Sequence, residues 1–197
     1  MENNLNGRAP GREVEIRLEF TPNPNALKYV LDDNTLLPRG TASFSDKAAA
    51  ENSPLARRLM AIQGVASCMI GSNFVSVTKT EDGDWEVLDI KTRDALKEHV
   101  LSGEPAVNPL SLDQAKVPKG EETDLTRKIR EVLDKEIRPA VAMDGGDVVF
   151  DSFTDGIVYV YMQGSCAGCP SSTATLKMGI ETRIRQAVPE VQEVVAL

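Results

Sequence analysis

The sequence predicts an α+β protein made of two small domains. Two segments, 13–102 and 123–197, each combine the alternating apolar residues of strands with the spacing of amphipathic helices. Between them, residues 103–122 contain several prolines and glycines and no periodic apolar face, which is typical of a linker. A chain of 197 residues can bury two such cores. Residues 1–12 are polar and are expected to form a flexible tail.

The composition is that of an ordinary soluble globular protein. Hydrophobic residues make up 41% of the chain and charged residues 26%. The net charge of −8 argues against binding to nucleic acid or to an anionic membrane. No run approaches the roughly 20 apolar residues of a membrane-spanning helix, and the first residues do not resemble a signal peptide. A cytoplasmic location is therefore the default expectation, with an organellar matrix as the alternative for a processed form.

The first domain is expected to begin with two strands joined by a rigid turn. Residues 14–20 alternate apolar and charged side chains, the pattern of a half-buried strand. The apolar face of this strand consists of Val14, Ile16, Leu18 and Phe20. Residues 21–25, with the sequence TPNPN, interrupt the pattern, and extended character resumes over 26–31.

The rest of the first domain is predicted to contain two helices, a hairpin and one more short strand. Ser53, which is followed by proline, is typical of a helix N-terminus. The runs 65–70 and 74–78 flank a short glycine-containing loop and are interpreted as a hairpin. Residues 85–88 are predicted as a short strand and residues 89–101 as an amphipathic helix. The apolar face of that helix is expected to contain Ile90, Leu96, Val100 and Leu101.

The second domain is predicted to open with a helix and a hairpin. Thr123 is expected to cap a helix that ends at Pro139. Its apolar face consists of Leu125, Ile129, Val132, Leu133 and Ile137. A turn over 143–147 then leads into a hairpin formed by strands 148–153 and 157–162.

A long helix and a final edge strand are expected to complete the second domain. Four apolar residues spaced four apart predict one buried stripe of a helix that Pro189 closes. These residues are Leu176, Ile180, Ile184 and Val188. The edge strand is predicted from Val191, Val194 and Val195.

Two cysteines lie in a loop of small residues between the hairpin and the last helix. Cys166 and Cys169 are three residues apart, a spacing that lets both thiols bind one metal ion. Pro170 and the serines after it predict a helix start, whose free N–H groups favour the thiolate form. On the residues alone, iron–sulfur ligation, structural zinc and a dithiol redox site all remain open.

The cysteine count constrains these alternatives. The chain has three cysteines, of which only two lie in this loop. An iron–sulfur cluster usually takes four thiolates, as does a four-thiolate zinc site. If either group is bound, two copies of the chain must each supply two ligands.

Other chemically active residues are assigned structural roles. Cys68 lies in an apolar run and is interpreted as a core residue. His99, the only histidine, is expected at a solvated or capping position. Trp85, Tyr159 and Tyr161 are interpreted as strand aromatics. With one histidine and no Ser/His/Asp set, acid–base or nucleophilic catalysis is not expected.

Two aspartates bracket a pair of glycines before the hairpin. Asp144 and Asp147 are interpreted as turn residues around Gly145 and Gly146, one of which needs a positive φ. The functional alternative is that these carboxylates help to position or release iron near the cysteine loop.

Four sequence stretches resemble a known family. The segments IRPAVAMDGGDVVF, GSCAGCPSSTATLKMGIE and VPEV, from about residue 123 to the end, resemble the NifU-like C-terminal domain of the Nfu iron–sulfur proteins. The segment TPNPNALKYV is similar to the Nfu N-terminal domain, over roughly residues 14–102. The resemblance implies a NifU-like second domain with its cysteine loop between hairpin and helix, and a [4Fe-4S] cluster bound between two subunits.

The same resemblance implies a carrier, not an enzyme. Only Cys166 and Cys169 match the ligand motif of the family. The implied partners are a second copy of the chain in the cluster-bound form, an upstream assembly scaffold and client apo-proteins that receive the cluster. No role for the first domain follows from the resemblance.

Overall fold

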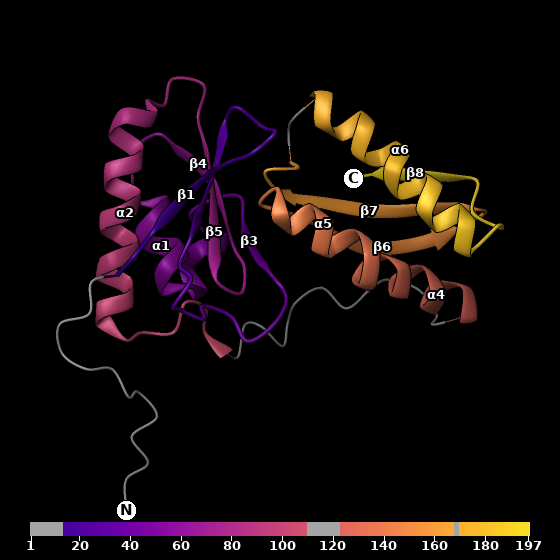
Figure 1. The fold of residues 1–197 in the computed structure, drawn as a ribbon, viewed down its shortest axis with the longest axis horizontal. Coiled ribbons are helices and arrows are strands. Elements are labelled where there is room, and N and C mark those ends of the chain that lie inside the picture. The colour runs from indigo at the N-terminus through magenta and orange to yellow at the C-terminus, as the bar shows by residue number, and fades with distance from the viewer. Residues whose placement is uncertain (1–13, 110–122, 168–169) are drawn as a thin grey trace, which may run out of the picture.

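A computed structural model describes residues 14–109, 123–167 and 170–197, with the backbone alone for 170–175. Figure 1 shows two units of mixed helices and strands lying side by side. Each unit has its own hydrophobic core. The predicted two-domain α+β architecture is therefore confirmed. The tail and most of the linker lie outside the described residues, so the domain boundaries stay a prediction.

The first domain is built on one antiparallel five-stranded sheet. In spatial order its strands are β1 (Arg17–Phe20), β2 (Ala26–Val30), β5 (Phe74–Lys79), β4 (Val65–Ile70) and β3 (Ala42–Phe44). The helices α1 (Pro54–Met60) and α2 (Trp85–Ser102) lie on the face of the sheet away from the second domain (Figure 1). A 3-10 turn, η1 (Ala49–Asn52), precedes α1.

The two faces of this sheet contact different parts of the molecule. Leu27 and Tyr29 of β2 belong to the core that α1 and α2 cover. Lys28 and Val30 alternate with them, and both contact the second domain. All five residues of β2 are buried for this reason. The predicted hairpin of β4 and β5 is confirmed.

The prediction for β1 is correct only in part. The strand covers Arg17–Phe20 rather than the whole of 14–20. Phe20, which alternation places on the buried face, is 86% exposed. This residue lies at the end of an edge strand, where the sheet no longer covers it.

Helix α2 begins earlier than predicted, so the prediction of a strand over 85–88 is wrong. The side chain of Asp84 accepts a hydrogen bond from the backbone N–H of Glu86 at 2.9 Å, which is an N-cap. Leu88 and Leu96 are buried, whereas Ile90 and Leu101 are exposed. The true apolar face is therefore rotated from the predicted one.

The chain after α2 returns to the first core. Ala106 and Val107 are buried in that core although they lie in the predicted linker. Ser53 caps α1 by accepting a hydrogen bond from Ala56 N at 3.0 Å, and its hydroxyl donates to Ala106 O at 2.6 Å. The N-cap of α1 thus also attaches this returning segment.

The second domain has a three-stranded sheet in the order β6 (Gly146–Thr154), β7 (Ile157–Gly164) and β8 (Glu193–Ala196). The hairpin and the edge strand are confirmed. The hairpin turn uses positive φ at Asp155 and Gly156, as a tight two-residue turn requires. The long last helix is α6 (Pro170–Ala187), in which Ile180 and Ile184 are buried as predicted.

The first helix of this domain continues beyond Pro139, so the prediction that Pro139 ends it is wrong. Helix α4 (Asp124–Val132) runs through a π-helical turn, η2 (Leu133–Ile137), into α5 (Arg138–Met143). A proline ring clashes with the carbonyl four residues earlier in a regular helix, and the wider π turn relieves that contact. Thr123 caps the helix as predicted.

Candidate functional site

Cys166 lies in the turn between β7 and α6. It follows the last residue of β7, Gly164, by two positions, and the turn is closed by a hydrogen bond from Ala167 N to Gly164 O at 3.1 Å. Cys166 is 6% exposed and packs in the second core. Cys169 lies outside the described residues, so a shared ligand site for the two thiols stays a prediction. The predicted helix start at Pro170 is confirmed.

The space for Cys166 is provided by a glycine. A Cβ atom built on Gly146 would lie 2.2 Å from the Sγ of Cys166, far closer than real atoms approach. Gly145, the preceding residue, has a φ of +77°, which confirms the predicted positive φ in this turn. Both glycines were predicted only as turn residues, and the contact of Gly146 with Cys166 was not predicted. The signal that could have found it is the second glycine, which the turn does not need.

Asp147 forms hydrogen bonds within its own domain and with the first domain. Its carboxylate accepts hydrogen bonds from Nε and Nη2 of Arg138, both at 2.8 Å, and another from the hydroxyl of Thr41 in the first domain. This ion pair raises the pKa of Arg138. The side chain of Asp147 is buried, whereas that of Asp144 is exposed. These contacts support the structural interpretation of Asp147 over a role in handling iron.

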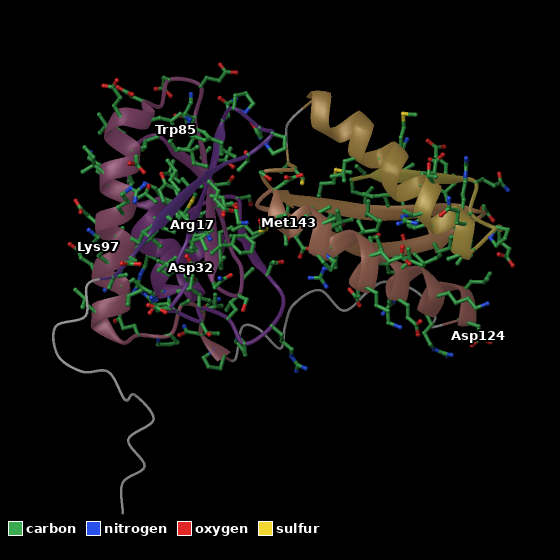
Figure 2. The ribbon with its side chains drawn as sticks, viewed as in Figure 1. Arg17, Asp32, Trp85, Lys97, Asp124 and Met143 are labelled. Carbon is green, nitrogen blue, oxygen red and sulfur yellow. The ribbon has the colours of Figure 1, made fainter. Side chains whose placement is uncertain are left out.

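The first domain contacts the turn before β6 through a row of residues on neighbouring strands. Ser76 pairs with Lys28 on one side and with Met69 on the other. Lys28 Nζ donates to Met143 O at 3.0 Å, and Ser76 Oγ donates to Gly145 O at 2.5 Å. A Cβ atom on Gly164 would lie 2.8 Å from Cε of Met69. Figure 2 shows the labelled Met143 where the two domains meet.

The TPNPN turn also reaches the cysteine loop. Asn23 is 4% exposed, and its Nδ2 donates to Ser165 O at 3.0 Å and to Ala167 O at 3.4 Å. These two carbonyls belong to the residues on either side of Cys166. From the sequence, this turn was expected only to connect two strands, and its contact with the cysteine loop was not predicted. No signal within a single segment of the sequence could have revealed it.

The other candidate residues have structural roles that do not involve the cysteine loop. Cys68 is buried in the first core, as predicted, and burial raises its pKa to about 12. His99 was expected at a solvated or capping position, and the solvated alternative is wrong, because the residue is 3% exposed in the last turn of α2. Burial lowers the pKa of His99, and its Nδ1 has no hydrogen-bond partner among the described residues. Trp85 opens α2 instead of lying in a strand, whereas Tyr159 and Tyr161 lie in β7 as predicted.

The described ranges contain neither a cluster of three metal-ligating side chains nor a membrane-spanning helix. No group of three or more His, Cys, Asp or Glu side chains gathers there in a metal-binding arrangement. No helix in the part of the chain that the structure describes is long and apolar enough to cross a membrane.

Known protein families match both domains. Residues 16–103 match the family described as scaffold protein Nfu/NifU N terminal, and residues 129–195 match the NifU-like domain. The human protein named NFU1 iron-sulfur cluster scaffold homolog, mitochondrial, is 41% identical over 186 residues, which span 94% of this chain and 72% of that protein. The Drosophila virilis protein of the same name is 34% identical, over 95% of this chain and 63% of its own length.

Solved structures give weaker matches. A solution NMR structure of a NifU-like protein from Saccharomyces cerevisiae shares 23% identity with a TM-score of 0.46, over 55% of this chain and 99% of that one. A crystal structure of a Staphylococcus aureus protein shares 23% identity with a TM-score of 0.37, over 42% of this chain and 98% of that one. The sequence matches decide the assignment: both domains match in the expected order, and the chain belongs to the Nfu family.

Proposed function

We propose that this chain is an iron–sulfur cluster scaffold and carrier that binds a [4Fe-4S] cluster through Cys166 and Cys169. The observation that carries the proposal is the position of Cys166 in a turn between β7 and α6, in a chain whose relatives are named iron–sulfur cluster scaffolds. Gly146 supports it, because the missing side chain leaves room for the thiol.

The cluster is shared by two copies of the chain. A [4Fe-4S] cluster takes four thiolates, and each chain supplies Cys166 and Cys169. Cys68 is not a further ligand in this proposal, because it belongs to the core on the helix-covered face of the first sheet rather than to the cysteine loop, and its raised pKa disfavours the thiolate. The cluster-bound form is therefore a homodimer.

The protein acts as a carrier rather than as an enzyme. The cluster is cargo, received from an upstream scaffold and passed to client apo-proteins. A half-site of two thiolates suits this role, since a thiolate of the client can replace one of them while the dimer opens. The mitochondrial relatives favour the organellar alternative over the cytoplasmic location first expected.

Anaerobic reconstitution of the full chain tests the proposal. The wild-type protein is expected to turn brown and to hold about four irons per two chains. Cys166→Ser and Cys169→Ser are each expected to lose the cluster, whereas Cys68→Ser, a matched control in the first core, is expected to load normally. Size-exclusion chromatography of the loaded protein should show a dimer.

Three other results would overturn the proposal. A colourless protein that holds zinc and unfolds on chelation would indicate a structural zinc dimer. Turnover of a small disulfide substrate without bound iron would indicate a thiol–disulfide redox protein. Normal cluster loading by the double variant Cys166→Ser/Cys169→Ser would exclude these residues as ligands.

A further inference from the structure

We infer that the first domain is part of the cysteine site and that Asn23 is a positioning residue for Cys166. The inference rests on the proposed function, because it concerns how a cluster ligand is held. It assigns the first domain a role that neither its composition nor its family match supplies.

The contacts of Asn23 lie directly beside the proposed ligand. Its amide nitrogen donates to the carbonyl oxygens of Ser165 and Ala167, so the peptide groups before and after Cys166 are held from the first domain. Both the amide and Ser165 are buried. A hydrogen bond at a buried position is costly to lose, since water does not replace it.

The turn that carries Asn23 is held by bonds among its own residues, independently of the cysteine loop. Pro22 and Pro24 fix the backbone φ on both sides of Asn23. The side-chain Oδ1 of Asn23 accepts a hydrogen bond from Asn25 N at 2.9 Å. The hydroxyl of Thr21 closes the turn by donating to Ala26 O at 2.9 Å. Because Oδ1 is bound within the turn, Nδ2 is directed at the cysteine loop.

Ser76 supports the same loop from a second point of the first domain. The carbonyl oxygen of Gly145 accepts hydrogen bonds from both Ser76 Oγ, at 2.5 Å, and Ser165 N, at 3.1 Å. The hydroxyl of Ser165 donates to Asp144 O at 2.5 Å. Ser165 is therefore held at its N–H, its hydroxyl and its carbonyl, and only the carbonyl depends on Asn23.

Removal of the Asn23 amide should loosen the loop without removing a ligand. The buried carbonyl of Ser165 and the partly buried carbonyl of Ala167 lose this donor, so the turn around Cys166 opens more often and the thiol is less well placed for the cluster. Loss of one or two such bonds corresponds to an opening rate or cluster release about threefold to tenfold faster. The number of irons bound should not change.

Three variants of the full chain test this inference. Asn23→Asp retains an oxygen that can accept from Asn25 N but cannot donate to the loop carbonyls. Asn23→Ala removes both functions, and Asn25→Ala is the control, because that side chain is exposed in the same turn. The first measurement is the rate of iodoacetamide alkylation of Cys166 in the cluster-free protein, resolved by mass spectrometry. The second is the rate at which reconstituted protein loses iron to a chelator.

Asn23→Asp and Asn23→Ala should raise both rates about threefold to tenfold, while Asn25→Ala matches the wild type. Alkylation of Cys68, which is buried in the first core, reports whether that domain stays folded. If Asn23→Ala labels Cys68 faster, Asn23→Asp alone decides the test.

Rates for Asn23→Asp within about twofold of the wild type would overturn the inference while leaving the proposed function intact. Failure of the wild-type protein to load a cluster would overturn the proposed function instead. In that case faster alkylation of Cys166 in Asn23→Asp would still establish the contact between Asn23 and the loop.

Discussion

Gly146 packs directly against the thiol of Cys166, so adding one methyl group, as in Gly146→Ala, tests the position of that thiol. The alanine Cβ at residue 146 would lie 2.2 Å from Sγ of Cys166, so one of the two must move. We expect Gly146→Ala to lower the free energy of unfolding by about 1–3 kcal/mol, as overpacking of a core does. It should also reduce cluster loading, because the shift falls on a proposed ligand. Urea denaturation and iron content measure the two effects.

Gly179 provides the matched control for that substitution. It is exposed in α6, and a Cβ atom there would meet nothing within 4 Å. Gly179→Ala should raise the free energy of unfolding by about 0.5–1 kcal/mol, because alanine favours the helix, and should leave cluster loading unchanged. Equal effects of both alanines would mean that the contact between Gly146 and Cys166 has no role in the site.

For single residues, burial was predictable from the sequence for Cys68 but not for His99. The apolar neighbours of Cys68 correctly predicted a core position. His99 is buried although Glu98 precedes it in the sequence, because the helix turns adjacent side chains by about 100° onto different faces. Burial of a helical residue thus depends on the face of the helix that carries it. The predicted apolar face of α2 was rotated from the true one, so the burial of His99 could not be seen in the sequence.

Among the elements, the N-cap of α1 does more than end a helix. Ser53 is fully buried, accepts from Ala56 N and donates to Ala106 O. Ser53→Ala should therefore lower the free energy of unfolding by about 1–3 kcal/mol, since it removes the N-cap of α1 and the hydroxyl that donates to Ala106 O. The change in urea midpoint of the full chain measures this loss.

The N-cap of α4 is the comparison for Ser53. Thr123 is exposed and makes the capping box with Thr126, so water can replace much of what its hydroxyl supplies. Thr123→Ala should lower the free energy of unfolding by only about 0.5–1 kcal/mol. If Ser53→Ala costs no more than Thr123→Ala, the bond to Ala106 contributes nothing to stability.

Elements with local signals were predictable from the sequence. The N-cap residues of α1 and α4 are Ser53 and Thr123, and the hairpin turn contains Gly156. Each of these residues lies next to or within the element that it helps to form, so the signal is local. Pro139 misled the prediction, because its effect depends on the π-helical turn before it. A helix register defect of this kind has no local signature.

At the scale of the whole molecule, the arrangement of the two domains could not be predicted. Lys28 and Ser76 read as ordinary polar residues of a strand, yet both are buried against the second domain. Their partners, Met143 and Gly145, offer only backbone carbonyls, which no side-chain pattern reveals. The sequence patterns predicted the two domains and the cysteine pair, and the family resemblance agreed with them, but neither indicated the face through which the domains meet.

Ser76 tests whether this interface couples the domains. Ser76→Ala leaves Gly145 O with one donor instead of two, and should lower the free energy of unfolding by about 1–2 kcal/mol. Because the same carbonyl binds Ser165 N, amide hydrogen exchange should quicken in the cysteine loop of the other domain. Ser43→Ala is the control: Ser43 pairs with Met69 at the end of the same strand row but is exposed, so stability should change by less than about 0.5 kcal/mol. If exchange in Ser76→Ala quickens only within the first domain, the bond from Ser76 to Gly145 does not couple the sheet face to the cysteine loop, and any hold of the first domain on that loop depends on Asn23.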